Sequence, residues 1–404
     1  MLKKQTLIAF SLLLVIAIVL SSCAPAAPAT EAPATEAPAT EAPVVEPPAT
    51  EVPAAATLKI GFLAGVQDPF YTTMQRGAAQ AAIDLGVELI TQIPQAWNVT
   101  DQTPMLDAMV SRGDLDFLFL APVDKNAMIA PLQAAYDSGL PLLTVDTYIG
   151  DGDYLNGEVT FPLSFIASDN FLGGQIACRA LADALGGTGK VYIQNVKVGI
   201  SSTDAREAGC KDVLAAEYPN VTLVGVDYND DDATKAQAQV EAMLQSTPDL
   251  GGIFGTNVFS AQGAGTVVQN KGLSGIVKVV AFDATSDAIN MLTNGTVDLV
   301  IAQKPSDMGY LAVAMAVAYL NGVTSIPKHI PTGYAVITRD NMADPNVSQF
   351  FYAPFDGNVT RKTAGLKIGF LAGVQDPFYI TMQRGAQVAA DAFGAELITQ
   401  IPQA

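Results

Sequence analysis

The sequence predicts an α/β protein built from two lobes, each with a doubly wound parallel sheet. A length of 404 residues suits two domains, and apolar residues make up 50% of the chain, enough for a sizeable core. From residue 58 onward, short apolar runs alternate with amphipathic runs, which is the pattern of strands and helices taking turns. About ten such pairs exceed one sheet of usual size, so two sheets are expected.

The predicted strands are short and almost unbroken in their apolar character. Strands of this kind are buried on both faces, as in a parallel sheet covered by helices on each side. We predict strands at 58–63, 88–92, 117–120, 141–145, 165–167, 190–194, 222–226, 252–255, 277–282 and 299–303.

The predicted helices lie between these strands and are amphipathic. Many are followed by glycine, the residue that favours the left-handed conformation at a helix C-terminus. We predict helices at 71–85, 103–111, 126–137, 171–185, 206–217, 233–245, 261–270, 286–292 and 308–320.

The N-terminus has the pattern of an export signal. Lys3 and Lys4 precede an apolar run from Leu7 to Leu20, which is shorter than the roughly 20 residues a membrane-spanning helix needs. The run ends in Leu20-Ser21-Ser22-Cys23, which resembles the lipobox of bacterial lipoproteins. We therefore expect residues 1–22 to be a lipoprotein signal peptide, with Cys23 as the lipidated residue; a plain cleaved signal peptide is the alternative.

The following segment, residues 23–57, reads as a linker. Residues 24–57 contain eight prolines and five glutamates, with no basic or aromatic residue, so they cannot bury a core. This composition predicts a solvated stalk between a lipid anchor in the cell membrane and the folded part.

Composition excludes several classes of function. Acidic residues outnumber basic residues 40 to 21, a formal charge of −19, which argues against nucleic acid as a partner. One histidine and three cysteines exclude a Cys/His metal cluster. The acidic runs 151–153 and 230–232 lack the spacing of a calcium loop, so solvated turns are favoured and no metal or cofactor is expected. Cys178 and Cys210 could form a disulfide or remain two buried thiols.

Polar and aromatic residues follow the predicted strands. In a parallel sheet the carboxyl ends of the strands meet at one edge, where ligands bind. The set contains carboxylates, amides, one guanidinium and an aromatic pair, which suit the hydroxyls and C–H faces of a neutral polyhydroxyl ligand. It consists of Asp68, Phe70, Tyr71, Asp146, Arg206, Asn257, Asp283 and Gln303.

Three stretches make the chain resemble the ribose-type periplasmic sugar-binding proteins, the type I substrate-binding subunits of ABC importers. They are Asp68-Pro69-Phe70-Tyr71, then 166–170 (IASDN) with Gly173-Gly174, and Val280-Ala281-Phe282-Asp283 before Ile301-Ala302-Gln303. The resemblance implies two lobes joined by a three-strand hinge that closes on ligand. It assigns 58–167 plus 304–331 to the N-terminal lobe and 168–303 plus 332–355 to the C-terminal lobe.

The resemblance also implies a role for each site residue. Phe70 and Tyr71 match the aromatic pair at the sugar ring, and Phe282 matches a second wall. Thr147 stands where ribose binders carry a second arginine, and Ala64 where they carry serine. These departures favour another sugar or a polyol. Hydroxyl partners are expected at Asp68, Asp146, Arg206, Asn257, Asp283 and Gln303.

Some of these residues have structural alternatives. Asp146 and Asp283 could be helix N-caps, and Asn257 could be only a cap or turn residue. Arg206 could pair with a neighbouring carboxylate on a helix surface. Trp97 follows a predicted edge strand, so packing in its loop is favoured over stacking on a sugar.

Residues 366–404 repeat residues 58–96, matching at 32 of 39 positions. The copy holds one predicted helix and two strands, which cannot cover their own apolar face. The copy could be the start of a second domain, an exposed remnant, or a segment that docks on another molecule. Exchange with 58–96 would give swapped oligomers of an otherwise monomeric protein.

Together these features predict an extracytoplasmic, lipid-anchored protein that captures a sugar or sugar-like polyol and delivers it to an ABC permease, without catalysis. Two alternatives are a ligand-sensing receptor subunit that feeds a membrane kinase or chemoreceptor, and an enzyme that acts on sugars on the same scaffold.

Overall fold

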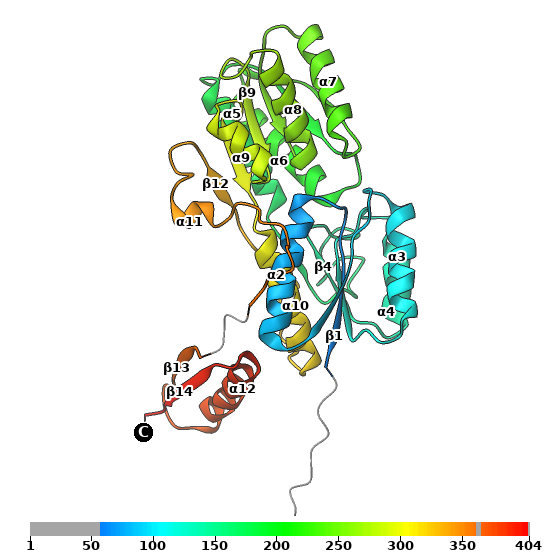
Figure 1. Cartoon of the computed structure of the whole chain (residues 1–404), viewed down its shortest axis with the longest axis vertical. Helices are drawn as coiled ribbons and strands as arrows, with labels where there is room; N and C mark the ends of the chain where they lie inside the picture. Colours follow the sequence, from blue (N-terminus) through cyan, green and yellow to red (C-terminus); the bar gives the residue numbers. More distant parts are fainter. Residues whose placement is uncertain (1–56, 361–364, 403–404) are drawn as a thin grey trace, which may run out of the picture. The chain divides into compact units, whose positions relative to one another are not determined.

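The computed structural model describes residues 57–360 and 365–402 (Figure 1). The expected signal peptide, Cys23 and all of the linker except Thr57 lie outside the described residues. None of the described helices is long and apolar enough to cross a membrane.

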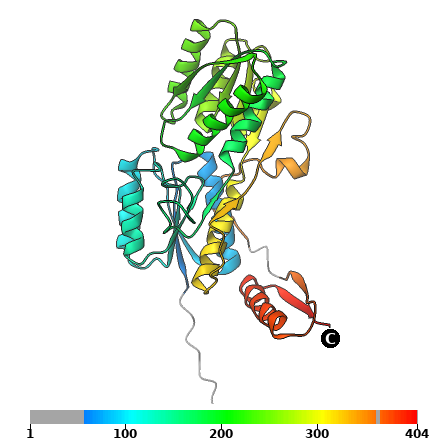
Figure 2. The same cartoon turned by 180° about the vertical axis from the view of Figure 1, so that it is seen from behind.

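Lobe one is built around a six-stranded parallel sheet with the order β11-β5-β4-β3-β1-β2. Helices α2 and α10 pack on one face of this sheet, and α3 and α4 pack on the other (Figures 1 and 2). The elements are β1 (Lys59–Leu63), α2 (Pro69–Leu85), β2 (Glu88–Gln92), α3 (Val99–Ser111), β3 (Phe117–Leu120), α4 (Ile129–Asp137), β4 (Leu142–Val145), β5 (Phe165–Ala167), α10 (Pro305–Leu320) and β11 (His329–Pro331).

Lobe two repeats this plan with the order β12-β10-β9-β8-β6-β7, and only β12 runs antiparallel to its neighbour. Its elements are α5 (Asn170–Ala184), β6 (Gly189–Asn195), α6 (Ser201–Glu217), β7 (Val221–Tyr228), α7 (Ala233–Ser246), β8 (Leu250–Gly255), α8 (Val258–Asn270), β9 (Lys278–Phe282), α9 (Ser286–Thr293), β10 (Leu299–Ala302), β12 (Ala335–Ile337) and α11 (Pro345–Ser348).

The chain passes between the two sheets three times: from β5 to α5, from β10 to α10, and from β11 to β12. This confirms the predicted class of two doubly wound lobes with a three-strand hinge. The expected lobe boundaries after residues 167, 303 and 331 remain our proposal for where each lobe ends. Strands β11 and β12 were not among the predicted strands.

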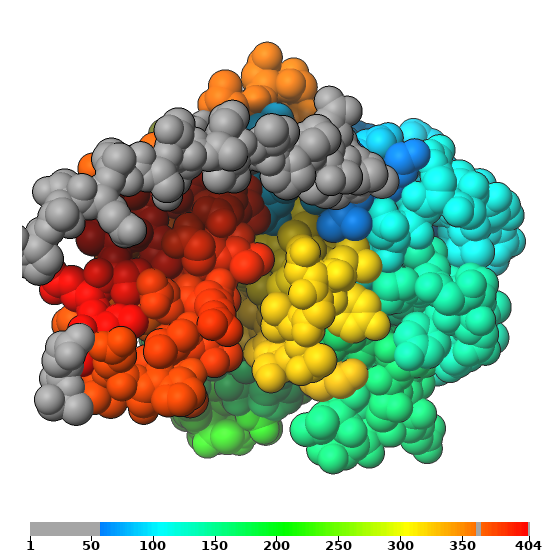
Figure 3. Space-filling model, turned by 90° about the horizontal axis from the view of Figure 1, so that it is seen from below, coloured from blue at the N-terminus to red at the C-terminus, as the bar shows by residue number. Residues whose placement is uncertain are grey.

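Glycines set the close packing of the helix pair in lobe one. A Cβ on Gly77 of α2 would lie 1.8 Å from the carbonyl oxygen of Ser306, and one on Gly309 of α10 would lie 2.1 Å from that of Met74. No side chain fits at either place, so the two backbones touch. The last turn of α10, in yellow in Figure 3, lies at the surface of lobe one.

The corresponding helix pair in lobe two, α5 and α6, is also linked covalently. Cys178 and Cys210 form a disulfide with their Cα atoms 5.1 Å apart, within the usual range for such bonds. The structure therefore decides between the two alternatives that the sequence left open. Both cysteines are fully buried in the core of lobe two.

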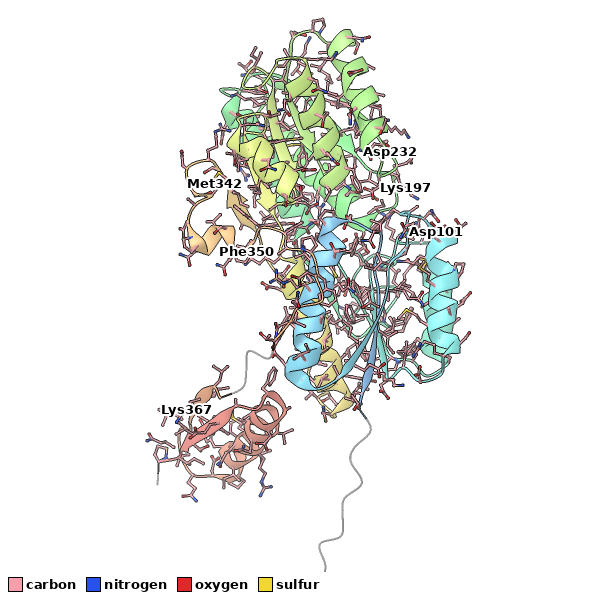
Figure 4. All side chains as sticks on the ribbon, in the orientation of Figure 1. Asp101, Lys197, Asp232, Met342, Phe350 and Lys367 are labelled. Carbon is pink, nitrogen blue, oxygen red and sulfur yellow. A yellow bond between two sulfur atoms is a disulfide. The ribbon has the colours of Figure 1, made fainter. Side chains whose placement is uncertain are left out.

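The repeat forms a separate β–α–β unit of β13 (Lys367–Leu371), α12 (Pro377–Phe393) and β14 (Glu396–Gln400). Its two strands pair only with each other among the described residues. Lys367, labelled in Figure 4, is the first residue of β13.

The disulfide closes a loop with a sequence separation of 32 residues. By chain entropy, Cys178→Ser/Cys210→Ser should lower the free energy of unfolding by about 3–4 kcal/mol. Chemical denaturation of the oxidised protein and of this variant measures the difference. Equal midpoints in oxidising buffer would show that the bond contributes no stability.

Candidate functional site

A polar cavity lies at the carboxyl ends of the strands, where residues of both lobes meet. The space between its lining residues is about 380 Å³, part of which is open to solvent. Lobe one contributes the first turn of α2 and residues from the loops after β1, β2 and β4. Lobe two contributes the start of α6 and residues that follow β6, β7, β8, β9 and β10. The lining residues are Val66, Asp68, Phe70, Tyr71, Trp97, Asp146, Val196, Ile200, Ser202, Thr203, Arg206, Asp231, Asn257, Asp283 and Gln303.

Lobe one supplies an aromatic wall with two carboxylates. Asp68 is the N-cap of α2 and accepts a hydrogen bond from the backbone N–H of Tyr71 at 2.8 Å. This cap fixes the first turn of the helix and with it the aromatic side chains that follow. Phe70 meets Tyr71 edge to face, and the Tyr71 hydroxyl donates to Oδ2 of Asp146 at 2.7 Å.

Trp97 extends this wall and also packs in its loop, as the sequence led us to expect. Its ring lies 5.8 Å from that of Tyr71, and its indole N–H donates to the carbonyl of Val123. The hydrogen bond turns the loop after β2 back over the sheet, so a tryptophan from an edge strand lines the cavity.

Lobe two supplies one guanidinium, held rigidly. Arg206 is only 2% exposed; its Nε donates to Oδ1 of Asn170 and its Nη1 donates to the carbonyl of Thr256. The guanidinium lies 4.1 Å above the ring of Phe282. Nη2 is buried and has no hydrogen-bond partner among the described residues. Arg206 is thus a cavity residue and not a surface ion-pair partner.

Phe282 supports this arginine from below and does not line the cavity, so the expected second wall is wrong in that respect. Successive strand residues point to opposite faces, and the chain turns at the next residue. Phe282 packs among Phe254 and Tyr334, and it acts on the cavity only through Arg206.

Asp283 sits in the left-handed region with φ 76°, and Asp146 does so with φ 62°. This conformation is uncommon outside glycine, although aspartate tolerates it better than most residues, and both aspartates adopt it directly after a strand. Asp283 accepts hydrogen bonds from Nε2 of Gln303 at 2.9 Å and from the Tyr352 hydroxyl at 2.7 Å. Thr285, not Asp283, caps α9, so the N-cap alternative for Asp283 is wrong.

A fourth carboxylate, Asp231, was missed in the sequence. It lies in the turn after β7 with φ 63°, next to Asp230 with φ 56°. Its Oδ1 accepts from Nδ2 of Asn257 at 2.6 Å, while Oδ1 of Asn257 caps α8 by accepting from the N–H of Ser260. Asn257 therefore combines the cap role with a place in the cavity. A run of aspartates is typical of solvated turns, so only the fold identifies this residue.

Burial dominates the electrostatics of the cavity. It raises the pKa of Asp146 to about 6, although Arg206 and the Tyr71 hydroxyl act in the opposite direction. Burial likewise raises the pKa of Asp231 to about 6 against the effect of Asn257, and it raises the pKa of Asp68 well above its ordinary range. The cavity thus contains several carboxyl groups that can form hydrogen bonds with a ligand.

The two lobes also touch directly beside the cavity. The ammonium of Lys125 donates to Oδ2 of Asp204 at 3.0 Å, and the backbone N–H of Lys125 donates to the carbonyl of Gly199. The hydroxyl oxygen of Ser201 accepts from the backbone N–H of Tyr148. These contacts join the two lobes beside the cavity.

Eight of the nine predicted binding residues line this cavity; the ninth is Phe282. The two departures from the ribose pattern are buried outside the lining: Thr147 donates its hydroxyl to the carbonyl of Pro122, and Ala64 lies in the core. Among the described residues, no group of histidine, cysteine or carboxylate side chains is arranged to hold a metal ion.

Comparison with known proteins gives a consistent picture. A family described as a periplasmic binding protein domain matches residues 60–324. The ribose import binding protein of Bacillus subtilis is 28% identical over 258 residues, which cover 64% of this chain and 79% of that protein. The xylose/arabinose-binding protein of Sulfolobus acidocaldarius is 24% identical and covers 71% of this chain and 72% of its own length.

Solved structures extend the comparison. A solute-binding protein of an ABC transporter from Agrobacterium vitis, bound with α-D-tagatopyranose, is 45% identical, with a TM-score of 0.72 over 74% of this chain and all of its own. A carbohydrate transporter solute-binding protein from Agrobacterium radiobacter, in complex with D-arabinose, is 27% identical, with a TM-score of 0.69 over 74% of this chain and 99% of its own.

The raised pKa of Asp146 predicts a pH-dependent stability in the absence of sugar. With a native pKa of about 6 and an ordinary value of 3.8, the folded state binds more protons than the unfolded state between these values. The cost of burying the ionised carboxylate is therefore full above pH 6 and disappears as the pH falls toward 4. Asp146→Asn should stabilise the protein at pH 7 by up to about 3 kcal/mol and lose this advantage at pH 4.

Thermal unfolding of the wild type and of Asp146→Asn between pH 4 and 7 measures this effect. The exposed Asp340→Asn serves as the control, because it removes the same charge far from any burial cost. A difference between wild type and Asp146→Asn that stays constant over this range would contradict the prediction.

Proposed function

Since this chain belongs to the periplasmic binding protein domain family and is a sugar-binding protein of an ABC import system, we propose that it encloses one neutral hexose between its lobes. Its relatives are extracytoplasmic binding proteins. The observation that carries the proposal is the convergence of Asp68 and Asp146 from lobe one with Arg206 and Asp283 from lobe two on one cavity.

The donor and acceptor set suits a sugar. Carboxylates at the cavity accept hydrogen bonds from ring hydroxyls, and a carboxylate can take two adjacent hydroxyls at once. Nη2 of Arg206 and Oε1 of Gln303, both buried and without a partner among the described residues, supply a donor and an acceptor. Phe70, Tyr71 and Trp97 present ring faces and edges to the C–H groups of the sugar.

D-Tagatose is the first candidate ligand. The solved structure that binds it is 45% identical to this chain, whereas the ribose and pentose relatives are below 30%. The replacement of a second arginine by Thr147 also argues against ribose, because a bidentate donor is lost. We therefore expect a ketohexose in its pyranose form.

Capture and release need no chemical step. The lining of the cavity contains no histidine, cysteine or lysine. We propose that the protein has no enzymatic activity and that the sugar shifts a population of open and closed forms, the closed form being the one the permease accepts. The contact between Lys125 and Asp204 would stabilise that form.

Asp283→Asn should weaken binding of D-tagatose about 10- to 100-fold, because a hydrogen bond to a charged group contributes about 1.5–3 kcal/mol. Isothermal titration calorimetry gives the affinity, and the melting point without sugar shows whether the variant is folded. Asp340→Asn is the matched control and should bind as the wild type does. A folded Asp283→Asn with wild-type affinity would remove Asp283 from the site.

We also propose that Cys23 carries the lipid that anchors the protein to the membrane. The support is the sequence Leu20-Ser21-Ser22-Cys23 after the apolar run and the linker that follows. In cells fed with radiolabelled palmitate, the wild type should carry label and fractionate with membranes, whereas Cys23→Ala should carry none. Equal labelling of both would contradict the anchor.

A further inference from the structure

The repeat at 366–400 does not merely resemble residues 58–92 in sequence; it folds into the same unit. Strand β13 pairs with β14 in the register of β1 with β2, so that Lys367 lies opposite Glu396 as Lys59 lies opposite Glu88. Asp376 caps α12 through the N–H of Tyr379, just as Asp68 caps α2. We call residues 58–96 the first copy and residues 366–404 the second copy.

The apolar face that the first copy buries in lobe one is exposed in the second copy. Phe70 is 4% exposed and its counterpart Phe378 is 66% exposed; Leu63 is fully buried and its counterpart Leu371 is 74% exposed. Ile368 and Met382 are also exposed, although their counterparts are core residues. The second copy thus presents, uncovered, the surface with which the first copy packs on lobe one.

The differences between the copies leave the fully buried apolar residues of this surface unchanged and fall at its edge, where Leu85 and Val87 are only partly buried. None of the changed positions is a glycine or a fully buried apolar residue of the first copy. The buried polar residues that change, Gln80 and Asp84, contact Thr360 and Tyr310. The changed positions are Thr72, Ala79, Gln80, Ile83, Asp84, Leu85 and Val87, which correspond to Ile380, Gln387, Val388, Asp391, Ala392, Phe393 and Ala395.

Two glycines show the fit most directly. A Cβ on Gly77 would meet the carbonyl of Ser306 in α10, and a Cβ on Gly61 would lie 2.8 Å from the side chain of Met109. Their counterparts Gly385 and Gly369 have no atom within 4 Å of such a Cβ. The second copy keeps both glycines where nothing in its own environment requires them, and lobe one is where they are required.

The segment before the second copy, residues 355–360, runs along α2 toward the place where the first copy begins. The N–H of Phe355 donates to the carbonyl of Thr72 near the start of α2, and the carbonyl of Thr360 accepts from Gln80 further along that helix. Strand β1 begins beside the end of α2, where the N–H of Glu88 donates to the carbonyl of Leu58. From Thr360 to Leu366 the chain can span about 20 Å, more than the roughly 8 Å left along α2.

We propose that the two copies are alternative occupants of one place in lobe one of the same chain, between β3 and α10. When the second copy docks, Asp376, Phe378 and Tyr379 take the positions of Asp68, Phe70 and Tyr71, so the sugar cavity is rebuilt with identical residues. The first copy is then released and adds its length to the linker before the folded part. Both arrangements leave one copy undocked and bury the same apolar residues, and the first copy alone adds the bonds of Gln80 to Thr360 and of Asp84 to Tyr310, which favours it in the wild type.

Gly77→Ala in the full-length chain tests this exchange, because the added methyl blocks docking of the first copy alone. Hydrogen–deuterium exchange with mass spectrometry reads out peptides from α2 and α12, which differ in mass through the changed positions. In the wild type, α2 should be protected and α12 should exchange fast. In Gly77→Ala, protection should move to α12, and the protein should stay monomeric by light scattering.

Two further variants complete the test. Gly385→Ala is the matched control and should keep the wild-type pattern, while Gly77→Ala/Gly385→Ala should leave both helices unprotected. Fast exchange of α12 in Gly77→Ala would overturn the proposal, whatever happens to α2. Protection of α12 that occurs only in concentration-dependent oligomers would overturn it too, since the second copy would then dock on another chain.

Discussion

The structure depends on burying several carboxylates and one guanidinium in a cavity between two lobes. Hydrogen bonds fix the position of these groups. Arg206 donates to Asn170 and to the carbonyl of Thr256, and Asp283 accepts from Gln303 and Tyr352. The desolvation cost remains visible in the raised pKa of Asp146. A ligand rich in hydroxyl donors would offset that cost, and the proposed closure of the lobes on a sugar rests on this exchange of hydrogen bonds.

The fold provides the positions that this arrangement needs. Parallel strands end at one edge, and in both sheets that edge faces the cavity, so residues directly after β1, β4, β8 and β9 converge. The chain crosses between the sheets at only three places, so each lobe keeps its own packed core, an arrangement that suits hinge motion between the lobes. Backbone contacts through Gly77 and Gly309 join α2 to α10 in lobe one, and the disulfide joins α5 to α6 in lobe two.

Sequence patterns predict those parts of the structure that a local rule determines. The buried strands and their order of appearance follow from apolar runs, and most of the cavity follows from the residues after them. Strands β11 and β12 were not predicted because three residues, such as His329–Pro331, are too few to show an alternating apolar pattern. Trp97 and Asp231 reach the cavity through loop conformations, a bond from the indole to Val123 and a left-handed turn, which no spacing in the sequence encodes. Phe282 shows the converse: the family resemblance predicts it as a second wall beside the sugar, whereas strand alternation places its ring against Arg206.

The most direct test of this account is a crystal structure with the hexose that stabilises the protein most in a thermal-shift screen. The account predicts closed lobes around one sugar, with Asp146, Arg206 and Asp283 each within about 3 Å of its oxygens. A sugar bound by residues of one lobe only, or lodged outside this cavity, would contradict it.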